Sequence, residues 1–345
     1  MKRAWAALFV TLAIVLPARL YAAFALVDPK TGFYTDGGRF AAVCAAAAVL
    51  GMVLAALFSR GHFAGGRCAP LRSVPVAGFA ALAAAFVVGQ SLVNMAASNG
   101  LNVMNGVLAL SGVCAAAALL MAAYDFGSGE TVLRQHPLAA LLVPAWGCLC
   151  MVSLFVSFGA SVNRFENVYH TCTAALLLLF LFSQAKLLAG VEEKEAGGVV
   201  FGYGFAAVIA ALTDAVPNLA LLFTGGLPDG SQSFPALLTS GGAGSFPPGM
   251  YFVDLALAVY VLAWLAAESR RRTAAPMVPI APGLSGSRQE PDAAACGEAP
   301  KTAAPAGGAD PMKQYLDFLQ KVYPSEHKFV EKGKPELVTA ESAKS

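Results

Sequence analysis

Eight long apolar stretches constrain the fold of this chain more than any other feature. A helix needs about 20 apolar residues to cross the hydrocarbon core of a bilayer, and each stretch approaches or exceeds that length. Charged residues make up only 13% of the chain, against about 25% in soluble globular domains. The sequence therefore predicts an all-α fold, a polytopic transmembrane helix bundle embedded in a lipid bilayer. We expect its eight spans at 5–27, 39–58, 75–94, 103–124, 137–159, 168–190, 199–223 and 248–268.

The positions of Lys and Arg between the spans predict how the bundle is oriented. The connections on the side of the N-terminus carry eleven Lys and Arg residues, whereas those on the opposite side carry three. Cytoplasmic connections of membrane proteins are enriched in these residues. We therefore expect a multi-pass protein of the plasma (cytoplasmic) membrane with both termini in the cytoplasm. A false or missing span would break this alternation, so the asymmetry also supports the number eight.

The first span has two interpretations. A basic start and an apolar run that ends before Pro17 resemble a cleaved secretory signal peptide. The apolar character resumes beyond Arg19 and continues as far as Val27, which favours a retained helix. Cleavage would leave seven spans in the same orientation.

The sequence divides into four parts. Residues 1–272 form the predicted bundle, and residues 273–311 form an Ala-, Pro- and Gly-rich linker with too few large apolar residues to fold. Apolar residues recur at helical spacing within 312–323, which predicts a short amphipathic helix. Residues 324–345 form a polar C-terminal tail. The short helix would rest on the membrane surface, bind a protein partner, or unfold in solution.

Three charged residues lie well inside the predicted spans. These are Arg19, Asp214 and Asp254, and each costs several kcal/mol in lipid unless it is paired or faces a cavity. From the predicted orientation, all three lie in the outer half of the membrane. We expect Arg19 to pair with one or both of the acids, and Asn218 lies one turn beyond Asp214.

Uncharged polar residues gather at the same level. We infer an outward-opening polar cavity around the charged residues. The alternative is that these polar groups reach interfacial water while one buried ion pair holds three helices in register, and a buried pair does not by itself stabilise a protein. The secondary polar residues of the outer half are Gln90, Asn94, Asn102, Asn105 and His170.

Two external connections lie above this level. The turn-rich segment 28–38 is suited to cap the cavity with Phe33 and Tyr34. The longer segment 224–247 is rich in Gly and Pro, and it acts either as a lid or as a simple tether.

The seventh span carries a stripe of small residues. Gly198, Gly202, Ala206 and Ala210 recur at steps of four, a spacing that lets another helix approach closely. Pro217 removes a backbone donor farther along the same span, so we expect a kink there.

Several functional classes find no support in the sequence. The chain has no HExxH, Walker or GxSxG motif and no convergent acid–base pair. We therefore predict no catalytic residues, no cofactor and no metal site. His170 and Cys172 are two residues apart and would face different ways on a helix, so they do not form a metal pair. A net charge of +2 with no basic face argues against nucleic-acid binding.

Two functional hypotheses remain from the sequence. The first is a membrane protein that binds or transports a small polar solute through an outward-facing cavity formed by Arg19, Asp214, Asn218 and Asp254. The second is a non-catalytic membrane scaffold or sensor that acts through its cytoplasmic tail helix at 312–323. An intramembrane enzyme is a distant third, because no acid–base pair is found.

Overall fold

The described chain is an assembly of membrane-length helices. The computed structural model describes residues 1–27, 34–60, 71–97, 103–158, 165–190, 193–224 and 249–274. Within these residues the only regular elements are helices, apart from one isolated β-bridge between Val27 and Tyr34. Among the described residues, eight helices are long and apolar enough to cross a membrane. This confirms the predicted all-α fold and the number of spans, while the orientation of the termini stays a prediction.

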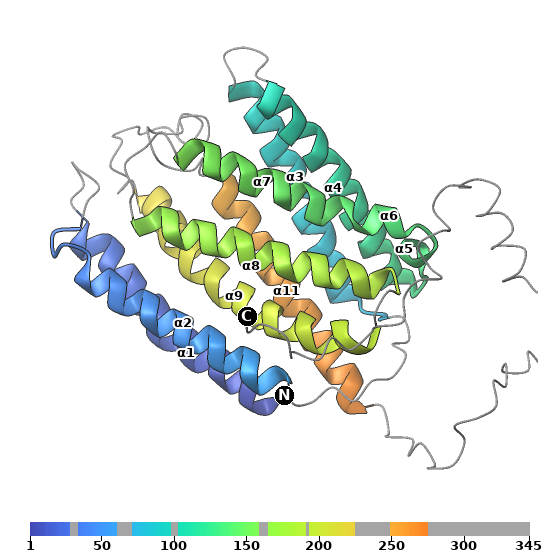
Figure 1. Cartoon of the computed structure of the whole chain (residues 1–345), viewed down its shortest axis with the longest axis horizontal. Helices are drawn as coiled ribbons and strands as arrows, with labels where there is room; N and C mark the ends of the chain where they lie inside the picture. The colour runs from blue at the N-terminus through green and yellow to red at the C-terminus, as the bar shows by residue number, and fades with distance from the viewer. Residues whose placement is uncertain are drawn as a thin grey trace, which may run out of the picture. The chain divides into compact units, whose positions relative to one another are not determined.

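The helices follow the predicted spans closely. Figure 1 shows their arrangement; the fifth predicted span, 137–159, is divided between the short helix α6 and the longer α7, and the short helix α5 precedes that span. The elements are α1 (Lys2–Tyr21), the π-helix η1 (Ala22–Leu26), α2 (Arg39–Arg60), α3 (Val74–Ala97), α4 (Val103–Ser128), α5 (Val132–Gln135), α6 (Pro137–Ala140), α7 (Leu142–Phe158), α8 (Phe165–Leu188), α9 (Glu193–Thr224) and α11 (Gly249–Ala274).

Six of the long helices pack as a closed ring. Helix α9 packs against α8, α8 against α7, and α7 against α4. The ring continues from α4 to α3, from α3 to α11, and from α11 back to α9. Helices α1 and α2 pack against each other and against α9, so this pair lies outside the ring (Figure 1). Helix α9 therefore has neighbours on most of its circumference.

Small residues allow the closest helix contacts. A Cβ atom added at Gly51 of α2 would overlap the Thr11 side chain of α1, and one added at Gly112 of α4 would overlap Ser91 of α3. A Cβ added at Gly202 of α9 would touch Ala56 and Ser59 of α2 at 3.7 Å. The small-residue stripe of the seventh span thus faces α2 at Gly202.

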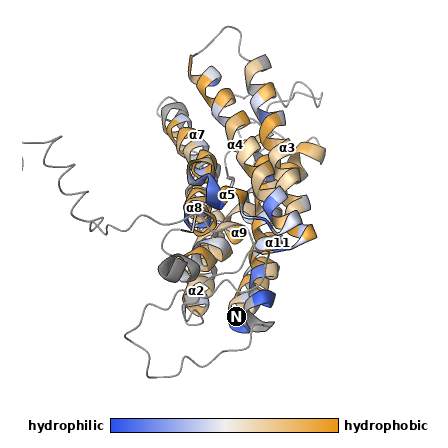
Figure 2. Ribbon diagram, turned by 90° about the vertical axis from the view of Figure 1, so that its right-hand side faces the viewer, coloured by the Kyte–Doolittle hydropathy of each residue, from blue (hydrophilic) through white to orange (hydrophobic). Residues whose placement is uncertain are grey.

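The outer faces of the helices are apolar. Hydrophobic residues dominate the helices in Figure 2, and large side chains such as Val10, Ile14 and Leu110 are more than half exposed. Contiguous apolar surface of this kind is unfavourable in water and favourable against lipid tails. By contrast, the polar residues Arg19, His170, Asp214 and Asp254 are buried among the helices.

Candidate intramembrane polar site

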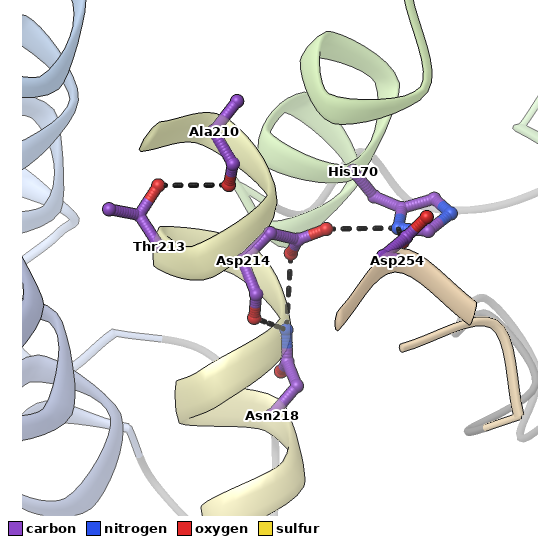
Figure 3. Close-up of polar contacts among 6 residues, drawn as sticks. All are labelled: His170, Ala210, Thr213, Asp214, Asn218 and Asp254. Carbon is purple, nitrogen blue, oxygen red and sulfur yellow. Dashed lines mark hydrogen bonds and ion pairs between the residues drawn. The ribbon is translucent and has the colours of Figure 1, made fainter. Parts of the chain in front are cut away.

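Three ionisable side chains from three helices converge inside the bundle. His170 comes from α8, Asp214 from α9 and Asp254 from α11, and Figure 3 shows both carboxylates close to one edge of the imidazole ring. The Nδ1 atom of His170 lies 3.0 Å from Oδ2 of Asp214 and 3.3 Å from Oδ2 of Asp254. We call these three residues the His–Asp–Asp cluster.

The cluster has more acceptors than donors. An imidazole nitrogen carries at most one hydrogen, and the contact from Nδ1 to Asp214 is the shorter of the two. Oδ2 of Asp254 accepts no hydrogen bond from the residues that the structure describes, although Asp254 is only 5% exposed. A buried carboxylate oxygen without a donor is costly. A proton on one of the carboxyl groups, or a cation, would satisfy this oxygen.

Asn218 fixes the position of one acid. Its Nδ2 donates to the backbone carbonyl of Asp214 at 2.9 Å and to Oδ1 of Asp214 at 3.2 Å. Asn218 lies one helical turn after Asp214, so the two side chains share a face of α9. Thr213 is directed away from the cluster and donates to Ile209 and Ala210 (Figure 3). Asp214 thus presents Oδ2 to His170 while Asn218 holds Oδ1.

Arg19 lies against two tyrosines. Its Nη1 donates to the hydroxyl of Tyr34 at 2.8 Å, and its guanidinium carbon lies 4.0 Å from the centre of the Tyr169 ring. The Tyr169 hydroxyl donates to the carbonyl of Ala41 in α2 at 3.0 Å. These contacts connect α1, α2 and α8 at the residue that immediately precedes His170. The expected pairing of Arg19 with Asp214 or Asp254 stays a prediction.

Tyr34 is held in place by the chain around it. The backbone N–H of Thr35 donates to the carbonyl of Leu26 at 2.8 Å, and Val27 pairs with Tyr34 in the isolated bridge. The carboxylate of Asp36 accepts hydrogen bonds from the N–H groups of Phe40 at 2.8 Å and Gly38 at 2.9 Å.

The Asp36 hydrogen bonds cap the start of α2. The bond from the Phe40 N–H lowers the pKa of Asp36 the most, and the Gly38 bond and the charge of Arg39 lower it further. Gly37 and Gly38 both have positive φ, which glycine adopts without strain. The segment 34–38 therefore places Tyr34 beside Arg19, as expected for a cap over the polar level.

The polar side chains are closed off from the molecular surface. Asp214 and Arg19 have no exposed area, His170 is 2% exposed, and Asn218 is 9% exposed. His170 also packs edge-on against the ring of Tyr251 in α11, with 5.6 Å between the ring centres. An opening toward the outside, as expected from the sequence, stays a prediction.

The structure brings together only some of the predicted polar residues. His170, Asp214, Asn218 and Asp254 form one connected group. Gln90 is buried in α3, and Asn105 is half-buried in α4. The Asn94 side chain, Asn102, Phe33, segment 225–248 and segment 312–323 lie outside the described residues.

His170 is more central than the sequence indicated. Its depth matched that of the acids, but nothing in the sequence showed that both carboxylates would contact its Nδ1 atom. Tyr169 and Tyr251 gave no sequence signal beyond their place near helix ends. The three cluster residues each offer one ligand atom, all within 4.8 Å of one another, so they are capable of holding a metal ion. Cys172 is exposed and takes no part.

Comparison with known proteins gives no family for this chain. No protein-family model matches it, and no curated protein or solved structure shows significant similarity to it.

Proposed function

We propose that this integral membrane protein transports a small polar solute, which binds at the His–Asp–Asp cluster beside Arg19. The observation that carries the proposal is the convergence of two buried carboxylates on one imidazole nitrogen inside membrane-length helices. Charged groups at such depth are costly, and in membrane proteins they mark substrate or ion pathways. The outer side of the predicted orientation is the side on which Tyr34 lies, and we place solute entry there.

A purely structural ion pair that holds the helices in register explains this cluster less well. Such a pair needs one cation and one anion in contact, whereas here two acids approach the same nitrogen at 3.0 and 3.3 Å. Two carboxylates that share one buried site disfavour each other's ionised forms. A bound solute that carries positive charge or hydrogen-bond donors would offset this effect.

We place the inner half of the proposed route along the inner face of α8, toward the opposite end of the bundle. His170, Thr173 and Gln184 are buried at helical spacing along α8. Between Thr173 and Gln184 lie the buried apolar side chains of Leu177 and Phe180. Two polar regions separated by an apolar layer fit a transporter that is closed between its outer and inner sides.

A small cavity lies at the far end of this route. It has a volume of about 20 Å³, and helices α4 to α8 and α11 line it. Gln184 and Tyr260 supply its polar groups, and Nε2 of Gln184 has no hydrogen-bond partner among the described residues. The space suffices for about one water molecule. The inner polar region is therefore able to hold water, as an inner vestibule of the route would require.

The test is solute uptake into vesicles that contain the purified full-length protein. The panel would include amino acids, sugars, organic anions, and monovalent and divalent cations, with uptake measured by mass spectrometry. We expect one class to enter faster than into protein-free vesicles. If no class does so with protein that is folded and correctly inserted, the proposed function is wrong.

Deletion of residues 312–323 separates this proposal from the scaffold or sensor alternative. A transporter should retain its flux without that segment, because the His–Asp–Asp cluster lies entirely in α8, α9 and α11. A sensor that acts through its tail would instead lose its partner and show no flux in either form.

A further inference from the structure

We infer that the His–Asp–Asp cluster binds a divalent first-row transition-metal ion. The inference rests on the proposed function, because it names the chemical class of the solute for the same site. One imidazole nitrogen and two carboxylate oxygens would coordinate the ion, and His170, Asp214 and Asp254 would be its three protein ligands.

The spacing of the three ligand atoms suits such an ion. Nitrogen and oxygen ligands bind zinc at about 2.0–2.2 Å, so ligand atoms around one ion are about 2.8–3.6 Å apart in octahedral or tetrahedral geometry. Nδ1 of His170 lies 3.0 Å from Oδ2 of Asp214 and 3.3 Å from Oδ2 of Asp254. Small side-chain movements would open a position that is equidistant from all three atoms.

A second observation supports a cation-binding role for these residues. Oδ2 of Asp254 is buried and accepts no hydrogen bond from the described residues, although it faces the same nitrogen as Asp214. A metal ion would bond to this oxygen directly. On binding, an imidazolium would release the hydrogen of Nδ1 as a proton and keep the hydrogen on Nε2, whereas a neutral ring would move its single hydrogen from Nδ1 to Nε2.

The ligand types select the class of ion. Magnesium and calcium prefer all-oxygen sites, and imidazole favours zinc, iron, nickel and copper, whereas carboxylates also suit manganese. One imidazole with two carboxylates therefore favours Mn²⁺, Fe²⁺ or Zn²⁺ over Mg²⁺ and Ca²⁺.

The electrostatic balance supports reversible binding. The two carboxylates carry two negative charges, which match a divalent ion. Arg19 adds a positive charge from α1, and its guanidinium carbon lies 4.0 Å from the ring centre of Tyr169, the residue before His170. This charge would weaken the attraction of the cluster for a metal ion, so we expect an ion that exchanges with solution rather than one that is permanently held.

The test measures metal binding to the full-length protein in detergent, after removal of any affinity tag and of metal by a chelator. Calorimetric titration with Mn²⁺ and Zn²⁺ should give one site per chain, while Mg²⁺ and Ca²⁺ should bind at least about tenfold more weakly. His170→Gln and Asp254→Asn should each weaken Mn²⁺ binding at least about tenfold. His136→Gln, which changes an exposed histidine outside the cluster, should bind like the wild type.

A spectroscopic measurement on the wild type keeps the test decisive if a variant does not fold. Electron paramagnetic resonance of bound Mn²⁺, with ¹⁵N-histidine labelling, should detect one coordinated histidine nitrogen. Absence of stoichiometric binding, or coordination by oxygen alone, would overturn the metal inference. Uptake of a different solute class with no metal binding would overturn it while leaving the proposed function intact. Metal binding without uptake of any solute would leave the metal site intact and reject transport.

Discussion

His170 Nδ1 and Asp214 Oδ2 lie 3.0 Å apart, although the two residues are 44 positions apart in the sequence and belong to different helices. This contact requires the inner faces of α8 and α9 to meet at one level of the bundle. Asp254 reaches the same nitrogen from α11. The relationship ties the fold to the candidate site, because a rotation of any of these helices would separate the three groups.

Replacement of Asp214 should show how much its carboxylate contributes to the stability of the protein. Asp214→Ala removes the carboxylate that contacts His170 and accepts from Asn218, which keeps only its bond to the backbone carbonyl of residue 214, and we expect a loss of about 3–5 kcal/mol of stability. Asp214→Asn keeps one acceptor oxygen and should cost about 1–3 kcal/mol. In thermal unfolding in detergent, the melting temperature should therefore be highest for the wild type, lower for Asp214→Asn and lowest for Asp214→Ala. Equal melting temperatures for all three would contradict the described contacts.

Tyr34→Phe tests the cap over Arg19. The substitution removes the hydroxyl that accepts the Arg19 hydrogen bond, and a hydrogen bond to a charged group contributes about 1.5–3 kcal/mol. We expect faster hydrogen exchange at backbone amides of residues 34–38. Tyr21→Phe is the matched control, because the Tyr21 side chain is 58% exposed. Equal exchange in the two variants would argue against the cap.

Gly51→Ala tests the close approach of α1 and α2. The added methyl group would overlap Thr11, and overpacking of this kind costs about 1–3 kcal/mol. Gly89→Ala is the control, because the space beside that helical glycine is open. Melting temperatures should fall for Gly51→Ala and not for Gly89→Ala. Adding Thr11→Ala to Gly51→Ala should restore part of the loss, and an additive further loss would contradict the contact.

Asp36→Ala should destabilise the start of α2 in a pH-dependent way. Hydrogen bonds from Phe40 and Gly38 lower the pKa of Asp36 in the folded protein, so its ionised form stabilises the fold above the pKa of the unfolded chain, about 4. That contribution disappears as pH falls through the lower folded value. The melting temperature of wild type should exceed that of Asp36→Ala at pH 7, and the difference should shrink below about pH 4. If the difference in melting temperature between wild type and Asp36→Ala grew on acidification, it would contradict a lowered pKa of Asp36 in the folded protein.

The fold was predictable because hydropathy reports directly on membrane-spanning helices. The second and fourth predicted spans begin at Arg39 and Val103, as do α2 and α4. The break between α5, α6 and α7 was not predicted. Pro137 begins α6 and disfavours helical conformation at the preceding residue, where α5 is separated from α6. Helix α7 starts two residues after α6 ends.

The level of the site was predictable, but its contacts were not. Depth follows from counting residues at about 1.5 Å per residue, which placed Arg19, His170, Asp214 and Asp254 together. Each residue also rotates the helix by about 100°. Which neighbouring helix a side chain points toward therefore depends on how the helices pack, and the residue count does not give it. From the sequence alone, Arg19 is therefore the expected partner of the acids, and His170 is only a secondary polar residue of the same level. The positions of Tyr34 and Tyr169 around Arg19 depend on long-range contacts that no local pattern encodes.

The central claim is that the His–Asp–Asp cluster is a working site, and Asp254→Asn tests it most directly. The substitution keeps the shape of the side chain and removes its charge. Flux of the transported solute and melting temperature should be measured together, with Glu130→Gln as a control at an exposed acid. We predict that Asp254→Asn folds yet loses flux at least about tenfold, while Glu130→Gln retains it. Wild-type flux in a folded Asp254→Asn protein would contradict the account.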